Sequence, residues 1–230
     1  SLDAITFISV LKACSKAQIL TKGKQIHGGI VLSGLLDKDI VLGTALIDMY
    51  ARCGEFAKAE QVLEELPVRD VVSWSALIGG YVRKGKAHEA LLCFEKMQCE
   101  GLSPDVVTFV SLLKACGTIG DIEMGKKVHN EINSMGLLEL NIVLGNSLVD
   151  MYVRCGVLVK AQEILKELPI RDVVSWNALI SGYSHQKQCR QAFNCFEQMQ
   201  SEGLVPDVVT FISLLKACGI TGAMGEGKKL

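Results

Sequence analysis

The chain has 230 residues, of which 49% are hydrophobic and 21% are charged, and its formal net charge is −1. This composition supplies ample material for a core and argues against disorder. The near-zero charge excludes a general electrostatic attraction for nucleic acid, so any nucleic-acid site has to be a local stripe of basic residues. No apolar run is long enough to span a membrane, and no membrane partner is predicted.

Long segments of the chain return after 102 residues. SPDVVTFVSLLKACG at 103–117 returns as VPDVVTFISLLKACG at 205–219, and LPVRDVVSWSALIGGYV at 66–82 returns as LPIRDVVSWNALISGYS at 168–184. Periodic self-similarity of this kind indicates an array of stacked structural units. Positions that stay fixed between copies are expected to pack, whereas positions that vary at one register are candidates for ligand recognition.

The unit boundaries follow recurrent Asp or Asn residues, each of which precedes a β-branched pair and can start a helix. They predict the units 4–39, 40–70, 71–105, 106–141, 142–172 and 173–207, and a partial unit 208–230. Within 71–105, apolar residues at helical spacing run from Trp74 to Tyr81, stop near Gly85 and resume from Ala90 to Met97. Each unit is therefore predicted to be an antiparallel helix pair, and the fold an all-α superhelical solenoid.

The strings DVVSWNALISGY, LIDMYARCG, FEQMQSEGLVPD and TFVSLLKACG, with the alternating unit lengths, resemble pentatricopeptide repeat (PPR) proteins of the plant PLS class over essentially the whole chain. By this resemblance 4–39 and 106–141 are L motifs, 40–70 and 142–172 are S motifs, and 71–105 and 173–207 are P motifs. The segment 208–230 is a partial L motif.

The resemblance implies sequence-specific binding of single-stranded organellar RNA, as the targeting array of a C-to-U RNA editing factor. In this family about one base per repeat is read, by the fifth and last residues of each motif. The implied pairs are Thr44 with Asp70, Ser75 with Asp105, Asn146 with Asp172, and Asn177 with Asp207.

The chemistry of these pairs suits particular bases. An ionised Asp only accepts hydrogen bonds, so it favours guanine and uracil, which carry an imino N–H on the pairing edge. A short Thr or Ser hydroxyl leaves room for a purine, while the longer Asn amide reaches a pyrimidine. Together with the family's code, this predicts the core 5′-N-G-G-N-U-U-3′.

Other residues are assigned supporting roles by position. The second residues of the S and P motifs, Val41, Val72, Val143 and Val174, are expected to clamp the bases, because stiff branched side chains lose little freedom in a fixed slot. The thirteenth residues Lys16, Arg52, Arg83 and Arg154 are possible phosphate contacts. The L motifs carry Ile8 and Val110 at position five, which cannot read a base, so they are expected to be spacers or docking sites for small editing-factor proteins.

Several alternative interpretations stay open on the sequence alone. The recurrent Asp residues could serve only as turn or capping residues. Trp74 and Trp176 could stack on bases, although their apolar helical surroundings favour core packing. The basic residues could be solvated surface charge. The whole array could instead be a tetratricopeptide-like scaffold that binds a protein.

No enzymatic activity, cofactor or metal site is predicted. Gly120 to Lys127 approaches a phosphate-binding loop but has Lys where a hydroxyl is needed. His129-Asn130-Glu131 matches only part of a zinc deaminase motif. The nine cysteines follow the repeat period and contain no CxxC, which favours small core residues in a reducing compartment. The resemblance implies a plant organelle, with the mitochondrion favoured over the chloroplast, and a targeting segment outside this sequence.

Overall fold

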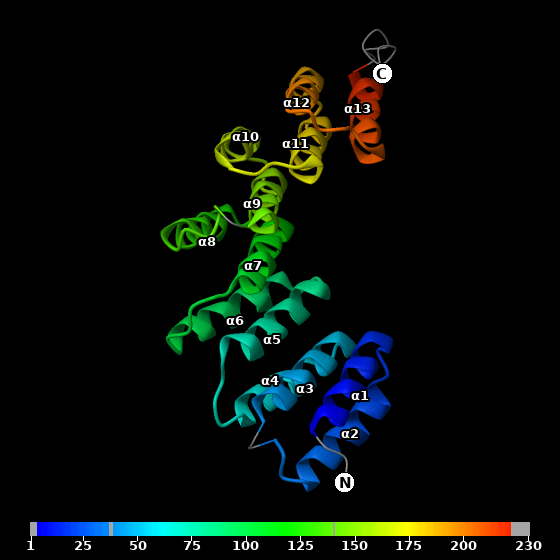
Figure 1. Ribbon diagram of the computed structural model, residues 1–230, viewed down its shortest axis with the longest axis vertical. Helices are drawn as coiled ribbons and strands as arrows, with labels where there is room; N and C mark the ends of the chain where they lie inside the picture. The colour runs from blue at the N-terminus through cyan, green and yellow to red at the C-terminus, as the bar shows by residue number, and fades with distance from the viewer. Residues whose placement is uncertain (1–3, 37–38, 140, 222–230) are drawn as a thin grey trace. The chain divides into compact units, whose positions relative to one another are not determined.

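A computed structural model describes residues 4–36, 39–139 and 141–221, which form thirteen α-helices and no strand (Figure 1). In chain order these are α1 Ala4–Ala17, α2 Leu20–Leu32, α3 Ile40–Cys53, α4 Phe56–Glu65, α5 Val71–Arg83, α6 Ala87–Cys99, α7 Val106–Ile119, α8 Ile122–Ser134, α9 Ile142–Arg154, α10 Leu158–Glu167, α11 Val173–His185, α12 Cys189–Ser201 and α13 Val208–Thr221. The all-α prediction is confirmed. Residues 222–230 of the last, partial unit lie outside the described residues.

The chain divides into two compact units, Ser1–Ala115 and Cys116–Leu230. In the first unit α3 packs between α1 and α5, α4 packs on α3 and α5, and α6 packs on α5. Consecutive odd-numbered helices thus form one layer, and each even-numbered helix covers the helix before it. No helix among the described residues has both the length and the apolar character needed to cross a membrane.

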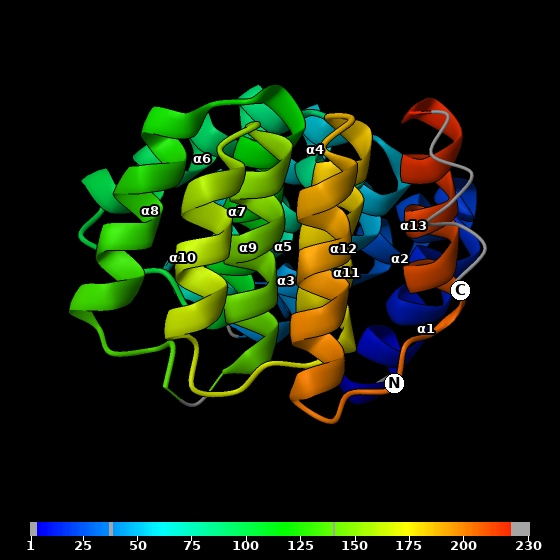
Figure 2. The same cartoon turned by 90° about the horizontal axis from the view of Figure 1, so that it is seen from above.

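The second unit repeats this packing. Here α11 packs between α9 and α13, while α10 packs on α9 and α12 packs on α11 and α13. Figure 2 shows α9 to α12 of this unit running side by side. The same local arrangement recurs because the apolar positions that pack the helices keep the same spacing in both copies.

Acidic or amide side chains start the odd-numbered helices from α3 to α13. Asp39 accepts hydrogen bonds from the backbone amides of Val41 and Leu42 at the start of α3, and Asn141 accepts one from Leu144 at the start of α9. Asp70 and Asp172 form capping boxes with the serine three residues later. Each cap satisfies backbone amides that the first helical turn leaves without an internal partner, which fixes where the helix begins.

The core of each unit is built from the repeated apolar positions. Trp74 and Trp176 are only 5% and 2% exposed, in agreement with core packing. A methyl group at Gly80 would collide with the Cβ atom of Ala51, so glycine allows α3 and α5 to approach closely. Six of the nine cysteines are buried and all nine are free thiols, as the sequence period indicates.

Candidate nucleic-acid interface

The last residue of each S or P motif lies at the N-terminus of the next odd-numbered helix. Asp70 Oδ1 accepts a hydrogen bond of 2.8 Å from the Ser73 amide, and Asp172 Oδ1 accepts one of 2.9 Å from the Ser175 amide. Asp105 and Asp207 accept equivalent bonds of 2.8 and 2.9 Å from Thr108 and Thr210. All four carboxylates are therefore capping groups, whatever else they do. A carboxylate has about four acceptor positions, so capping leaves room for further partners.

In the second unit the residues paired from the sequence are in direct contact. Asn146 Nδ2 donates to both carboxylate oxygens of Asp172, at 3.1 and 3.2 Å, across 26 residues of sequence. Asn177 Nδ2 donates to Asp207 Oδ1 at 2.8 Å. Each amide lies on the second turn of one odd-numbered helix and each carboxylate at the start of the next, so the packing of neighbouring helices brings the pair together.

The two asparagines differ in what holds the other end of the amide. Asn177 is 7% exposed, and its Oδ1 accepts a 2.6 Å hydrogen bond from the Thr210 hydroxyl. The buried Oδ1 of Asn146 has no hydrogen-bond partner among the described residues. A buried acceptor without a partner costs about 1 to 3 kcal/mol. Of the two asparagines, only Asn146 therefore has an amide oxygen without a hydrogen-bond donor among the described residues.

The counterparts in the first unit carry short hydroxyl side chains. Thr44 is half-buried in the first turns of α3, and Ser75 on α5 is 8% exposed. The sequence leads us to expect the position-five residues at an accessible inner surface, and both Ser75 and Asn177, at 8% and 7% exposed, are more enclosed than that. The Ser75 side chain is small, so neighbouring side chains cover most of it. Asp70 is half-buried, and Asp105 is exposed.

In each unit exposed valines accompany these pairs. The four residues at the second motif position are all more than half exposed: Val41 at 58%, Val72 at 58%, Val143 at 57% and Val174 at 61%. Each follows directly after the first residue of its helix, next to the carboxylate or amide that caps that helix. An apolar side chain held in water at every repeat is available to pack against a flat apolar ligand face.

In the second unit one pair, Asn177 with Asp207, lies in an open groove of about 710 Å³. Val174 and Val209 line it together with Asn177 and Asp207, and Asp150, Arg154 and His185 line another part. The hydrogen bond from the Thr210 amide has the largest effect on the pKa of Asp207 and lowers it. Desolvation opposes this effect, and a hydrogen bond from the Asn177 side chain lowers the pKa further. The carboxylate is therefore ionised at neutral pH and can only accept hydrogen bonds. The groove combines an apolar edge, a fixed polar pair and a cation.

A second cavity, in the first unit, collects positive charge. Its volume is about 320 Å³, and Lys16, Arg52 and Arg83, three of the four residues expected to contact phosphates, line it with Lys84, Ser15 and Gln18. The fourth, Arg154, lies in the groove of the second unit and pairs with Asp150 at 2.6 Å.

One carboxylate organises the cationic cavity. Asp48 accepts hydrogen bonds from Ser15 of α1 at 2.8 Å, from Arg52 of α3 at 2.9 Å and from Arg83 of α5 at 3.0 Å. Burial, and then the neighbouring Arg52, lower the pKa of Arg83, while Asp48 opposes both effects. The cluster holds more positive than negative charge, so a bound anion would relieve the repulsion.

Sequence reasoning missed Asp48, Ser15 and Lys84. The spacing of Asp48 and Arg52 by four residues, repeated by Asp150 and Arg154, was the available signal, because such pairs meet on one helical face. The contact of Ser15 and Arg83 with Asp48 depends on helix packing and leaves no local signal. In the second copy Ser15, Arg83 and Lys84 are replaced by Gly117, His185 and Gln186. Positive charge is therefore concentrated in the first copy.

The enzyme-like motifs have structural roles. Asp121, inside the segment 120–127, caps α8 by accepting from the Met124 amide at 3.0 Å. His129 Nδ1 lies 3.0 Å from the Tyr152 hydroxyl. The described residues contain no group of three or more His, Cys, Asp or Glu side chains that could hold a metal ion. The related segment 222–229 lies outside the described residues.

Comparison with known proteins decides the family. A model described as the PPR repeat family matches residues 69–118 and 171–219, and a model of the PPR repeat matches 44–71, 107–137 and 146–173. The chain belongs to the pentatricopeptide repeat family. Together these matches span residues 44–137 and 146–219, which contain the four residue pairs predicted to read bases.

PPR proteins of Arabidopsis thaliana are similar over almost the whole chain. One is 39% identical over 222 residues, covering 96% of this chain and 30% of the relative. The chloroplastic protein CRR2 is 42% identical over 234 residues, covering 99% of this chain and 35% of the relative. The chain thus spans about a third of the length of these relatives.

Solved structures share the fold. The crystal structure of the PPR protein PPR10 in complex with an 18-nt psaJ RNA element superposes with a TM-score of 0.74 at 18% identity, covering all of this chain and 34% of that one. PPR10 from maize, in another crystal structure, superposes with a TM-score of 0.58 at 22% identity, over 94% of this chain and 37% of that one. Repeated helix pairs of the PPR kind are therefore the architecture of this chain.

Proposed function

We propose that this PPR segment binds single-stranded RNA and reads about one base per S or P unit with its position-five and terminal side chains. The contact between Asn177 and Asp207 beside Val174 in one groove is the observation that carries the proposal. PPR10, a structural relative, was crystallised with an RNA element. The base lies between successive valines, and the polar pair meets its edge.

The hydrogen-bond chemistry supports guanine at the first two pairs and uracil at the last two. Asp172 and Asp207 accept from the imino N–H of uracil, directly or through a water. Thr44 and Ser75 carry shorter side chains, which leave space for a purine beside Asp70 and Asp105. The proposed core is 5′-N-G-G-N-U-U-3′.

The larger protein is proposed to be a PLS-class factor for C-to-U RNA editing in a plant organelle. The L, S and P assignments 4–39, 40–70, 71–105, 106–141, 142–172, 173–207 and 208–230 are part of this proposal. Ile8 and Val110 stand at the fifth position of the L motifs and are half-buried. Apolar residues there suit spacing, or docking of small editing-factor proteins, better than base reading.

Fluorescence anisotropy with two labelled RNAs tests the proposed function. One RNA carries GGNUU at the core, and the other carries AANCC in the same flanks. We expect tighter binding of the first, because adenine and cytosine present an unprotonated ring nitrogen where the Asp carboxylates need a donor. Equal affinity would contradict the code. Binding of neither RNA would favour a protein-binding scaffold.

The cationic cavity should control the salt dependence of RNA binding. Replacing Arg52 and Arg83 by Gln is expected to reduce the slope of log affinity against log salt by about 0.7 for each phosphate that the protein no longer neutralises. Base preference should stay unchanged, because phosphate contacts carry no sequence information. Anisotropy titrations at several salt concentrations measure the slope.

The control for this experiment is Lys160→Gln. Lys160 lies on α10, pairs with Glu163 at 3.0 Å and is not among the residues that line either cavity. Its replacement should leave the slope as it is. An equal decrease of the slope in the control and in the arginine variant would show that the cavity has no special part in binding phosphate.

A further inference from the structure

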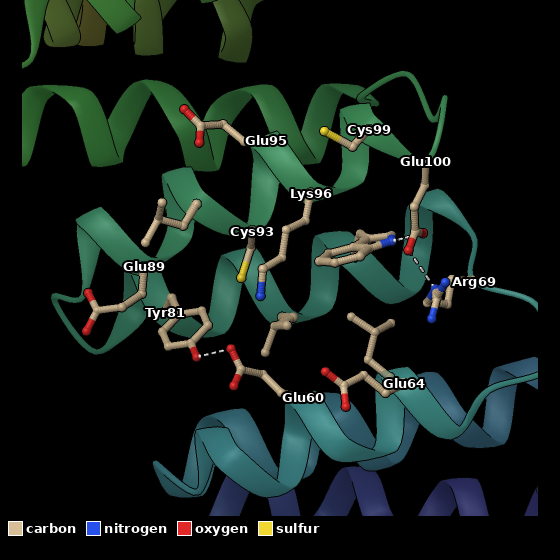
Figure 3. A pocket seen from close by; sticks show the side chains of 14 residues that line it. Glu60, Glu64, Arg69, Tyr81, Glu89, Cys93, Glu95, Lys96, Cys99 and Glu100 are labelled. Carbon is tan, nitrogen blue, oxygen red and sulfur yellow. Dashed lines mark hydrogen bonds and ion pairs between the residues drawn. The ribbon is translucent and has the colours of Figure 1, made fainter.

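The first unit has an open groove of about 730 Å³ between α4 and α6, with α5 as its floor (Figure 3). Leu63 of α4, Trp74, Leu77 and Tyr81 of α5 and Cys93 of α6 line the floor and are each at most 5% exposed, and Leu92 of α6 adds an exposed apolar side chain. Leu92 is 56% exposed, and the corresponding residue of the second copy is Asn194. None of these residues belongs to the proposed base-reading pairs or to the cationic cavity.

The polar atoms of the floor are satisfied from the rim. Trp74 Nε1 donates to Glu100 Oε2 at 2.9 Å, and Arg69 pairs with the same carboxylate at 2.8 Å. The Tyr81 hydroxyl donates to Glu60 Oε1 at 2.8 Å, as Figure 3 shows. What the groove leaves open is therefore apolar surface.

The rim of the groove is acidic. Glu60, Glu64, Glu89, Glu95 and Glu100 line it against two cations, Arg69 and Lys96, which gives five negative and two positive charges, a net of −3. The whole chain carries only −1. Negative charge is therefore concentrated around this apolar floor, where it attracts a positively charged partner and repels nucleic acid.

The second copy keeps the scaffold and loses this character. Trp176 donates to Glu202 at 2.9 Å, Arg171 pairs with Glu202 at 2.8 Å, and Tyr183 donates to Gln162 at 2.8 Å, as in the first copy. The rim positions change as follows: Glu60 to Gln162, Glu64 to Lys166, Glu89 to Gln191, Leu92 to Asn194, Lys96 to Gln198 and Cys99 to Ser201. Glu197 and Glu202 are then balanced by Lys166 and Arg171, for a net of zero.

This comparison separates packing from binding. Helix pairing, the buried Trp and its Glu partner are the same in both copies, so the acidic rim and the exposed leucine are not required by the fold. An apolar floor bordered by carboxylates has the shape and charge that a helix with one apolar face and flanking Lys or Arg residues needs.

We propose that the groove between α4 and α6 is a docking site for a basic amphipathic helix of a protein partner. Apolar side chains of the partner cover Leu92 and the floor of the groove beside Trp74, and its Lys or Arg side chains meet Glu60, Glu64 and Glu95. The site is independent of the RNA-binding surface, so both ligands can be held by the same chain.

A labelled synthetic peptide that carries Leu on one helical face and Lys beside it tests the proposal. The chain has two tryptophans, so the Trp176→Phe variant reports from Trp74 in the groove, and Trp74→Phe reports from the second copy. We expect the peptide to change the Trp74 fluorescence and to leave the Trp176 fluorescence unchanged. A peptide with Glu in place of Lys should not bind.

The second copy supplies the matched variants. Glu60→Gln, Glu64→Lys, Glu89→Gln and Leu92→Asn together give the first groove the residues that stand in the second copy, and should weaken peptide binding at least about tenfold without changing the base preference of RNA binding. The reciprocal changes Gln162→Glu, Lys166→Glu, Gln191→Glu and Asn194→Leu should move the fluorescence change to Trp176. Thermal unfolding of each variant checks that it folds.

Three results would overturn the proposal. The first is equal peptide affinity in the wild type and in the variant with neutralised rim. The second is equal affinity for the Lys and Glu peptides, which would mean that charge does not select the ligand. The third is a concentration-dependent increase in mass of the free chain that the same substitutions abolish, because the groove would then be covered by a second copy of the chain.

Discussion

Replacing Asn146 by Thr is expected to shift the preferred base at its slot from uracil to guanine. The change recreates the Thr44 and Asp70 pair of the first copy at the same register of an S unit. It removes the amide that donates to Asp172 and the Oδ1 that has no partner, and it opens space beside the carboxylate. At about 1 to 3 kcal/mol for a good base contact, the affinity ratio changes by about five- to 150-fold.

Anisotropy with four RNAs that differ only at this base measures the shift. Thr44→Asn is the reciprocal variant and should shift its own slot from guanine to uracil, and Asn177→Thr should act in the same way on the last base of the core. Ser147→Ala is the control, because the Ser147 hydroxyl donates to the backbone of its own helix at Val143. An unchanged base profile in the Asn146 variant would refute the reading of this position.

Replacing Trp176 by Ala is expected to destabilise the second unit by about 3 to 5 kcal/mol. The indole is 2% exposed, and its Nε1 donates to Glu202 at 2.9 Å. The substitution leaves a cavity between α11 and α12 and removes a hydrogen bond from Glu202. Urea unfolding followed by circular dichroism measures the destabilisation, which should be concentrated in the neighbouring repeats because a repeat contacts only its neighbours.

Val159→Ala serves as the control for the tryptophan variant. Val159 on α10 is 70% exposed, so its truncation should change stability by no more than about 0.5 kcal/mol. If Trp176→Ala retained full stability and no longer bound RNA, the indole would be a stacking platform for a base and not part of the core. If Trp176→Ala is less stable but keeps its base preference at urea concentrations well below its unfolding midpoint, the result agrees with a place for the indole in the core.

The terminal carboxylates couple stability to recognition. Asp172 and Asp207 cap α11 and α13 while they hold the position-five amides. Removing an N-cap costs about 1 kcal/mol of stability by itself. Substituting these Asp residues therefore mixes two effects, whereas the position-five residues can be exchanged while every cap stays in place. The exchange experiments above use those positions for this reason.

Local features of the amino-acid sequence determined that this chain is a stack of helix pairs. The helical spacing of Trp, Leu and Tyr set which face of each helix is buried. Each Asp or Asn before a β-branched pair marked the start of a helix, and at Asp70 and Asn141 the structure shows the side chain capping that helix. These signals act within one or two helical turns, so they can be read from residues close together in the chain. Internal repetition also identified the positions that vary between copies.

Only the tertiary structure decided which distant groups share a partner. Thr210 holds the amide of Asn177, Asp48 joins Ser15 and Arg83 from two other helices, and the carboxylates of α4 face Leu92 of α6 across an apolar floor. These contacts depend on the separation and rotation of neighbouring helices, which the summed packing of many side chains fixes. No single residue pattern encodes them, because each residue contributes to its own helix and meets its partner only after the helices have packed.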